Sequence, residues 1–110
     1  MDLSYKNSKL KKSLTKDSEL IKKYGQRAKK LKQRLTLLRT APSLFDISRL
    51  PPTRLHQYKG DREGEWSIDI SPNWRIVFEI DTSGEKQTKD GEADTKSYTA
   101  IKILSIEDPH

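Results

Sequence analysis

Two histidines, His56 and His110, are the residues in this sequence best suited to acid–base chemistry. Histidine exchanges protons near neutral pH because its ordinary pKa is ~6.5. Taken alone, His56 is either an ordinary strand residue or a catalytic group, and His110 is either a tail residue or a catalytic group. No metal-ligand spacing supports a zinc site, so neither a metal nor another cofactor is expected.

The two histidines acquire partners if the last strand of the chain pairs with the strand that contains Arg75. The end of that last strand would then lie near the strand of His56, in one shallow cleft. Two imidazoles and a cation suffice for metal-free RNA cleavage: one group takes the proton of the ribose 2′-hydroxyl, the cation stabilises the phosphorane-like transition state, and an acid protonates the departing 5′-oxygen. The predicted catalytic residues are His56, Arg75, Asp108 and His110.

Length and composition limit what this chain can be. Its 110 residues are enough for one domain, which we expect to span 1–110. Cysteine is absent, which excludes disulfides, a thiol nucleophile and Cys-based zinc sites. No run approaches the ~20 apolar residues that a membrane helix requires, and no secretion signal is evident. We therefore expect a cytoplasmic protein that does not enter a membrane.

Charge is distributed unevenly along the chain. Residues 1–40 contain 13 Lys or Arg against three Asp or Glu, whereas residues 41–110 contain nine against 13. A basic half joined to a nearly balanced half indicates a face for a polyanion such as a nucleic acid. A lysine-rich surface that is merely solvated explains the same numbers, so both interpretations stay open here.

The basic half is predicted to be helical. Leucines recur at intervals of three or four residues among lysines, which is the pattern of amphipathic helices. The expected helical segments are 8–15, 17–24 and 26–39. Gly25 breaks the second from the third, and Pro42 ends the last.

The second half is predicted to be a sheet over residues 54–110, because apolar residues there alternate with polar ones. The expected strands are 54–58, 66–70, 74–80 and 99–106. Residues 2–5 are read either as a short first strand or as a frayed arm. Residues 81–97 contain almost no apolar side chains and are expected to form a mobile loop. The fold class is therefore α+β, with two to three N-terminal helices packed on three to four antiparallel strands.

A long motif in the sheet half resembles a known family. Residues 55–68 read L-H-x-x-K-G-D-R-x-G-x-W-S-I and are followed by N-W-R-I at 73–76. This pattern is similar to that of the HigB toxins, which belong to the RelE/ParE superfamily of bacterial type II toxin–antitoxin systems. The resemblance covers most of the chain apart from the loop at 81–97.

The resemblance implies a fold, an activity and partners. The fold would be RelE-like, a microbial-RNase-like sheet covered by N-terminal helices. The activity would be that of an mRNA interferase, an endoribonuclease that enters the ribosomal A site, contacts ribosomal RNA and cuts translated mRNA. The neutralising partner would be a HigA-like antitoxin with a helix-turn-helix domain.

The resemblance also implies roles for single residues. His56 occupies the position of the family's catalytic histidine, and Arg75 and Asn73 match positions that contact RNA and phosphate. Lys59 and Arg62 match a basic loop that holds phosphates or ribosomal RNA. Asp108 and His110 match the ends of a terminal D-Y-H motif. The tyrosine of that motif is Pro109 here, and proline has no phenol to hydrogen-bond or stack, which predicts a weaker nuclease.

Two other functions are compatible with the same residues. The chain would be a non-catalytic basic domain that binds RNA or the ribosome if the histidines are structural. It would be a ParE-like toxin if it acts on DNA gyrase through protein contacts. Histidines and Asp108 near one cleft favour the ribonuclease among the three.

Overall fold

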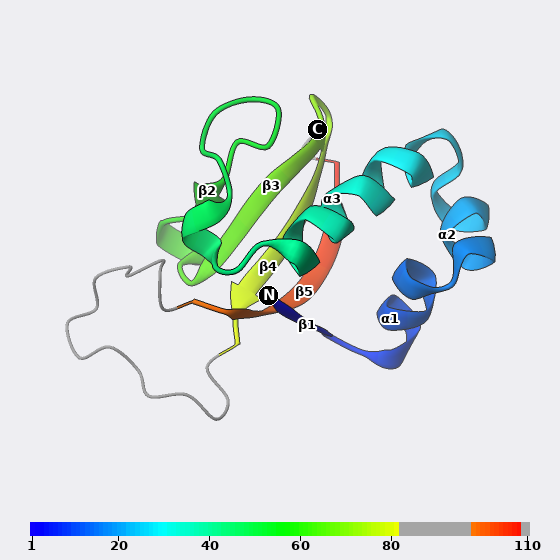
Figure 1. The fold of residues 1–110 in the computed structure, drawn as a ribbon, viewed down its shortest axis with the longest axis horizontal. Helices are drawn as coiled ribbons and strands as arrows, with labels where there is room; N and C mark the ends of the chain where they lie inside the picture. The colour runs from blue at the N-terminus through cyan, green and yellow to red at the C-terminus, as the bar shows by residue number, and fades with distance from the viewer. Residues whose placement is uncertain (82–97, 109–110) are drawn as a thin grey trace.

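The computed structural model describes residues 1–81 and 98–108, which form helices beside one twisted sheet (Figure 1). The helices are α1 (Ser8–Thr15), α2 (Asp17–Tyr24) and α3 (Ala28–Thr40), with short 3₁₀ helices η1 (Gly25–Arg27), η2 (Leu44–Asp46) and η3 (Gly60–Arg62). The strands are β1 (Asp2–Tyr5), β2 (His56–Gln57), β3 (Glu65–Ser71), β4 (Trp74–Ile80) and β5 (Ala100–Glu107). The α+β prediction is confirmed.

Local signals define the three helices close to where the sequence predicts them. The Asn7 side chain accepts a hydrogen bond of 2.8 Å from the backbone N–H of Leu10 and so caps α1. Gly25 ends α2 with φ of 55°, a left-handed conformation that costs glycine little. The predicted apolar stripe of α3 is buried in full, and it consists of Ala28, Leu31, Leu35 and Leu38.

The sheet has the strand order β1-β5-β4-β3-β2, so it contains one strand more than the largest number predicted. The additional pairing, β1 with β5, is parallel, whereas all the other pairs are antiparallel. Sequence pattern did not reveal this pairing because β1 and β5 lie at opposite ends of the chain. The predicted strand 54–58 is also shorter in the structure, where only His56 and Gln57 pair with β3.

The two faces of the sheet have different characters. One face carries the large apolar side chains of β3, β4 and β5, which pack with α3 and its flanking segments into the core. In Figure 1, α3 crosses this face, and α1 and α2 lie beside it. The opposite face is mostly polar, because strand side chains alternate between faces. In the residues that the structure describes, no helix is long and apolar enough to cross a membrane.

Candidate active site

Strand register places His56 on the polar face of the sheet. His56 pairs with Ser67, which pairs with Val77, which in turn pairs with Ser105. Side chains paired in this way point to the same face of a sheet. Val77 is the apolar residue of this row. It is completely buried, yet it lies outside the main core cluster.

Two pairs further along the strands, and therefore on the same face, Arg75 lies between two carboxylates. Arg75 on β4 pairs with Asp69 on β3 and with Glu107 on β5. The condition stated from the sequence is therefore met: the last strand pairs with the strand of Arg75. His56 and the end of β5 share one face of the sheet, with β3 and β4 between them.

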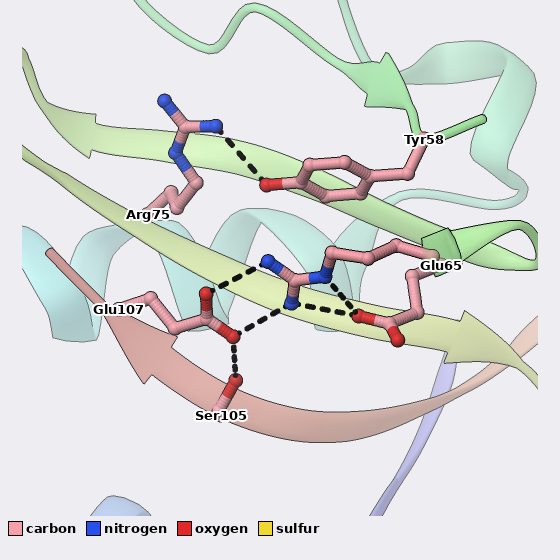
Figure 2. Close-up of polar contacts among 6 residues, drawn as sticks. Tyr58, Glu65, Arg75, Ser105 and Glu107 are labelled. Carbon is pink, nitrogen blue, oxygen red and sulfur yellow. Dashed lines mark hydrogen bonds and ion pairs between the residues drawn. The ribbon is translucent and has the colours of Figure 1, made fainter. Parts of the chain in front are cut away.

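Tyr58 links the histidine to the arginine. One guanidinium nitrogen of Arg75 donates a hydrogen bond of 3.0 Å to the Tyr58 hydroxyl. The Tyr58 ring meets the His56 ring edge to face, with 5.0 Å between the ring centroids. Figure 2 shows the Tyr58 ring reaching toward Arg75 above the sheet. These contacts restrict the orientation of both candidate catalytic side chains.

A cavity of about 260 Å³ brings His56 and Arg75 together. Its lining also includes two arginines from the segment before β2, Arg49 and Arg54, together with Asp69. Arg54 has φ of 49°, which is uncommon for any residue other than glycine. A cation-rich cavity beside an exposed histidine has the charge and size to receive a phosphodiester group.

Arg62 forms the second polar network of this face, but its guanidinium is already occupied. It bonds to Glu65 at 2.7 Å and to Glu107 at 2.8 Å, and its guanidinium carbon lies 4.6 Å from the centre of the Tyr58 ring. Ser105 donates a hydrogen bond to the same Glu107 carboxylate. Figure 2 shows Glu65, Ser105 and Glu107 around this guanidinium.

These bonds change the acidity of both partners. Hydrogen bonds to Glu107 and Glu65 raise the pKa of Arg62 above its already high ordinary value. The hydrogen bond from Arg62 lowers the pKa of Glu107, although partial burial opposes that change. The network is therefore a charged brace across the sheet from η3 to β5 at neutral pH.

The remaining predicted site residues lie around this face or outside the described residues. Lys59 is exposed immediately before η3, and Asn73 is exposed in the two-residue turn between β3 and β4. Asp108 is exposed directly after β5. His110, Pro109 and almost all of the predicted loop 81–97 lie outside the described residues. The structure thus brings His56 and Arg75 together, while the contribution of His110 stays a prediction.

Sequence reasoning missed Glu107, Arg49 and Arg54 as neighbours of the candidate site. A signal for Glu107 was present, because its position two residues after Ser105 puts both side chains on one face of the last strand. The two arginines precede β2 in irregular backbone, where no periodicity indicates which way a side chain points.

Comparisons with known proteins point to a single superfamily. Residues 3–90 match the family model described as a RelE-like toxin of the type II toxin–antitoxin system HigB. A stretch of 56 residues, 51% of this chain, is 41% identical to the endoribonuclease HigB of Proteus vulgaris. That stretch covers 60% of the relative, so the match spans less than two thirds of the relative's length.

Solved structures agree on the fold. A YoeB/ParE toxin from Agrobacterium tumefaciens superposes over 100% of both chains with a TM-score of 0.58 at 18% sequence identity. YafQ from E. coli superposes over 98% of this chain and 92% of its own with a TM-score of 0.53, also at 18% identity. At such low identity these likenesses establish the fold and leave the activity to be argued from the site.

Proposed function

Since the chain belongs to the HigB-like family of RelE-like toxins from type II toxin–antitoxin systems, we propose that it is an endoribonuclease that cleaves translated mRNA on the ribosome. The curated relative is named an endoribonuclease, which supports RNA as the substrate. The observation that carries the proposal is the shared cavity of His56 and Arg75, with Arg75 oriented by Tyr58.

The proposed reaction breaks one phosphodiester bond with no external oxidant or cofactor. A base takes the proton of the ribose 2′-hydroxyl, the 2′-oxygen attacks phosphorus, and the bond from phosphorus to the 5′-oxygen breaks. An acid returns a proton to the departing 5′-oxygen, which leaves a 2′,3′-cyclic phosphate. His56 supplies one of these proton transfers and His110 the other, either histidine acting as the base.

Arg75 is proposed to stabilise the charge that develops on the non-bridging phosphate oxygens. Its guanidinium is held by Tyr58 before substrate binds, so little reorganisation is needed as the charge develops. Asp108 is proposed to act at the same end of the sheet, directly after the strand that pairs with Arg75. Lys59 and Asn73, both exposed, are proposed to hold the RNA backbone.

The ion pairs of Arg62 support a different role from the one its motif position implies. A guanidinium bonded to two carboxylates has few donors left for a phosphate. We therefore propose that Arg62 positions β5 and the Tyr58 ring, and that other cations bind the RNA.

The proposed partners follow from the family. A toxin of this class requires a cognate antitoxin, for which we propose a HigA-like helix-turn-helix protein. The ribosomal A site and its RNA are the proposed place of action, and the cytoplasm the proposed location.

Induced expression of the chain in bacteria, followed by primer extension along a translated message, tests this function. We expect growth arrest and new mRNA 5′ ends for the wild type and for Gln57→Ala, a change at the exposed neighbour of His56 on β2. His56→Ala and Arg75→Ala should abolish both effects. Ribosome association without new 5′ ends would favour the non-catalytic binding domain. A DNA-damage response with intact mRNA would favour action on gyrase.

A further inference from the structure

A second concave surface lies on the other side of the sheet, between the first two helices and the ends of β4 and β5. It encloses a cavity of about 520 Å³. Cations and aromatic rings dominate the lining, which includes Lys6, Lys9, Lys23, Arg27, Tyr24 and Trp74. We call this surface the basic groove. No Asp or Glu is among the described residues that line it.

The cations of the basic groove have no carboxylate partner among the described residues, whereas Arg54 and Arg62 near the candidate active site are ion-paired. Within residues 1–81 and 98–108, the ion pairs occupy Lys32, Arg54, Arg62 and Lys102. None of them involves Lys6, Lys9, Lys23 or Arg27. Like charges gathered on one surface without counter-charges repel each other and attract a polyanion.

Arg27 is the cation of the basic groove whose position is most restricted. Its guanidinium carbon lies 4.5 Å from the centre of the Trp74 ring, so the two groups form a cation–π contact. A cation–π contact holds a guanidinium over a ring without using its N–H donors for a hydrogen bond to an acceptor. Such a group is prepared to form paired hydrogen bonds with a phosphate.

The basic surface continues past the groove along α2 and α3. An adjoining cavity of about 570 Å³ shares Lys23, Tyr24 and Arg27 with the groove. It adds Lys22 and Lys30, and it reaches Ile70 and Ser71 at the end of β3. The two cavities therefore form one basic track that ends at the β3–β4 turn.

The β3–β4 turn connects this track to the candidate active site. Trp74 and Arg75 are consecutive residues of β4, so their side chains point to opposite faces of the sheet. Trp74 packs against the core side and lines the basic groove, whereas Arg75 lines the cavity with His56. A chain that crosses the exposed turn at Asn73 can contact both surfaces.

We propose that the basic groove binds the phosphodiester backbone of single-stranded RNA on one side of the scissile bond, with Arg27 as its central phosphate ligand. The RNA then runs from the cavity of His56 and Arg75, over Asn73, to Lys9 and Lys23. This inference rests on the proposed function for the identity of the polyanion. It assigns to the groove the phosphate-binding role for which Arg62, bonded to two carboxylates, has few donors left.

Fluorescence anisotropy with a single-stranded RNA of about 12 nucleotides tests the proposal. The RNA carries 2′-O-methyl riboses, which remove the nucleophile and make binding measurable without cleavage. The groove variant is Lys9→Gln with Lys23→Gln. The control variant is Lys11→Gln with Lys12→Gln, which removes the same charge from exposed positions of α1 outside the groove. Each variant also loses one lysine from the last turn of a helix.

The groove variant should bind RNA about five- to ten-fold more weakly than the control variant. Each lysine that contacts a phosphate releases counterions from the RNA, and this favourable contribution is lost with the contact. The slope of log affinity against log salt should fall by about 1.4 for two contacts to a single strand. Arg27→Lys, which keeps the charge but loses the planar donor fork, should also weaken binding relative to the control.

Equal affinities of groove and control variants, or no RNA binding by the wild type at about 50 mM salt, would overturn the inference. Polyglutamate of matched charge that binds the groove as tightly as RNA would also overturn it, in favour of an acidic protein partner. A wild type that binds RNA through the groove but produces no new mRNA 5′ ends would refute the proposed nuclease and leave the groove assignment intact.

Discussion

The Tyr58 hydroxyl accepts a hydrogen bond of 3.0 Å from Arg75, which joins the segment after β2 to the beginning of β4. Tyr58 also touches His56 through its ring and lies beneath the Arg62 guanidinium. One side chain thus contacts the candidate general acid–base, the candidate electrostatic catalyst and the brace to β5.

Replacement of Tyr58 by Phe should slow RNA cleavage while leaving the ring contacts in place. The change removes only the acceptor of the Arg75 hydrogen bond, and a hydrogen bond to a charged group contributes about 1.5–3 kcal/mol. Because Arg75 then samples more orientations, we expect the single-turnover cleavage rate to fall about ten-fold. Cleavage assays on programmed ribosomes measure the rate, and a thermal melt of the same sample confirms folding. An unchanged rate would mean that Tyr58 does not position Arg75.

Replacement of His56 by Ala should lower the cleavage rate by about 10²–10⁴-fold, which is the usual size of a proton-transfer contribution. His56 is exposed on a two-residue edge strand, so its loss should hardly change the melting temperature. Gln57→Ala, at the adjacent exposed position, is the matched control and should retain the wild-type rate. A similar loss of rate in both variants would assign the effect to the strand rather than to the imidazole.

Replacement of His110 by Ala should reduce the cleavage rate by a similar factor, if this histidine supplies the second proton transfer. The measurement is the same single-turnover assay, with His56→Ala and the double variant alongside. When two groups act in one step, the effects of their substitutions on the rate are strongly non-additive. The double variant should therefore be little slower than either single variant. Wild-type activity of His110→Ala would remove this residue from the mechanism.

Stability should decrease at acidic pH, because the pKa of Glu107 is lowered in the folded protein. A carboxyl with a depressed folded pKa stabilises the fold above its unfolded pKa of ~4.3, and this stabilisation is lost as the pH falls through the folded value.

Urea unfolding of the wild type and Glu107→Gln as a function of pH measures the effect. The two proteins should differ in stability at pH 7 and converge at low pH. The difference at pH 7 should be below about 1 kcal/mol because the pair is partly solvated. A constant difference across the range would contradict this assignment.

Replacement of Leu31 by Ala should destabilise the domain by about 2–5 kcal/mol, since Leu31 is fully buried in the stripe of α3. Leu37, on the same helix, is only partly buried, so Leu37→Ala is the matched control with a smaller expected loss. Chemical denaturation of both variants gives the comparison. Equal losses would show that α3 does not pack through the predicted stripe.

Sequence patterns predicted the features that depend on neighbouring residues. The helices follow from apolar spacing and caps, and the β3–β4 hairpin follows from alternation on either side of a short turn. The placement of His56 and Arg75 on one face follows from the same alternation once the strands are paired. These features involve short sequence separations, and local signals specify them well.

Features that depend on distant residues were not predictable in the same way. The parallel pairing of β1 with β5 joins opposite ends of the chain, and the contact of Arg62 with Glu107 spans 45 residues. The motif assigned Arg62 to phosphate, but only the folded chain reveals that two carboxylates occupy it. Arg27 and Trp74 likewise lie on separate elements, so neither spacing nor composition indicates their contact.

The position of β5 between β1 and β4 has a consequence for how the chain folds during synthesis. In a nascent chain that ends before residue 100, α1 to α3 and the β3–β4 hairpin have already been synthesised. The edge of β4 that pairs with β5 and the strand β1 then have no partner strand. Unpaired strand edges recruit other strands, so such truncated products should aggregate. Arrival of β5 closes both edges and delivers Glu107 to Arg62 in one event, so the fold and the brace across its polar face are completed together.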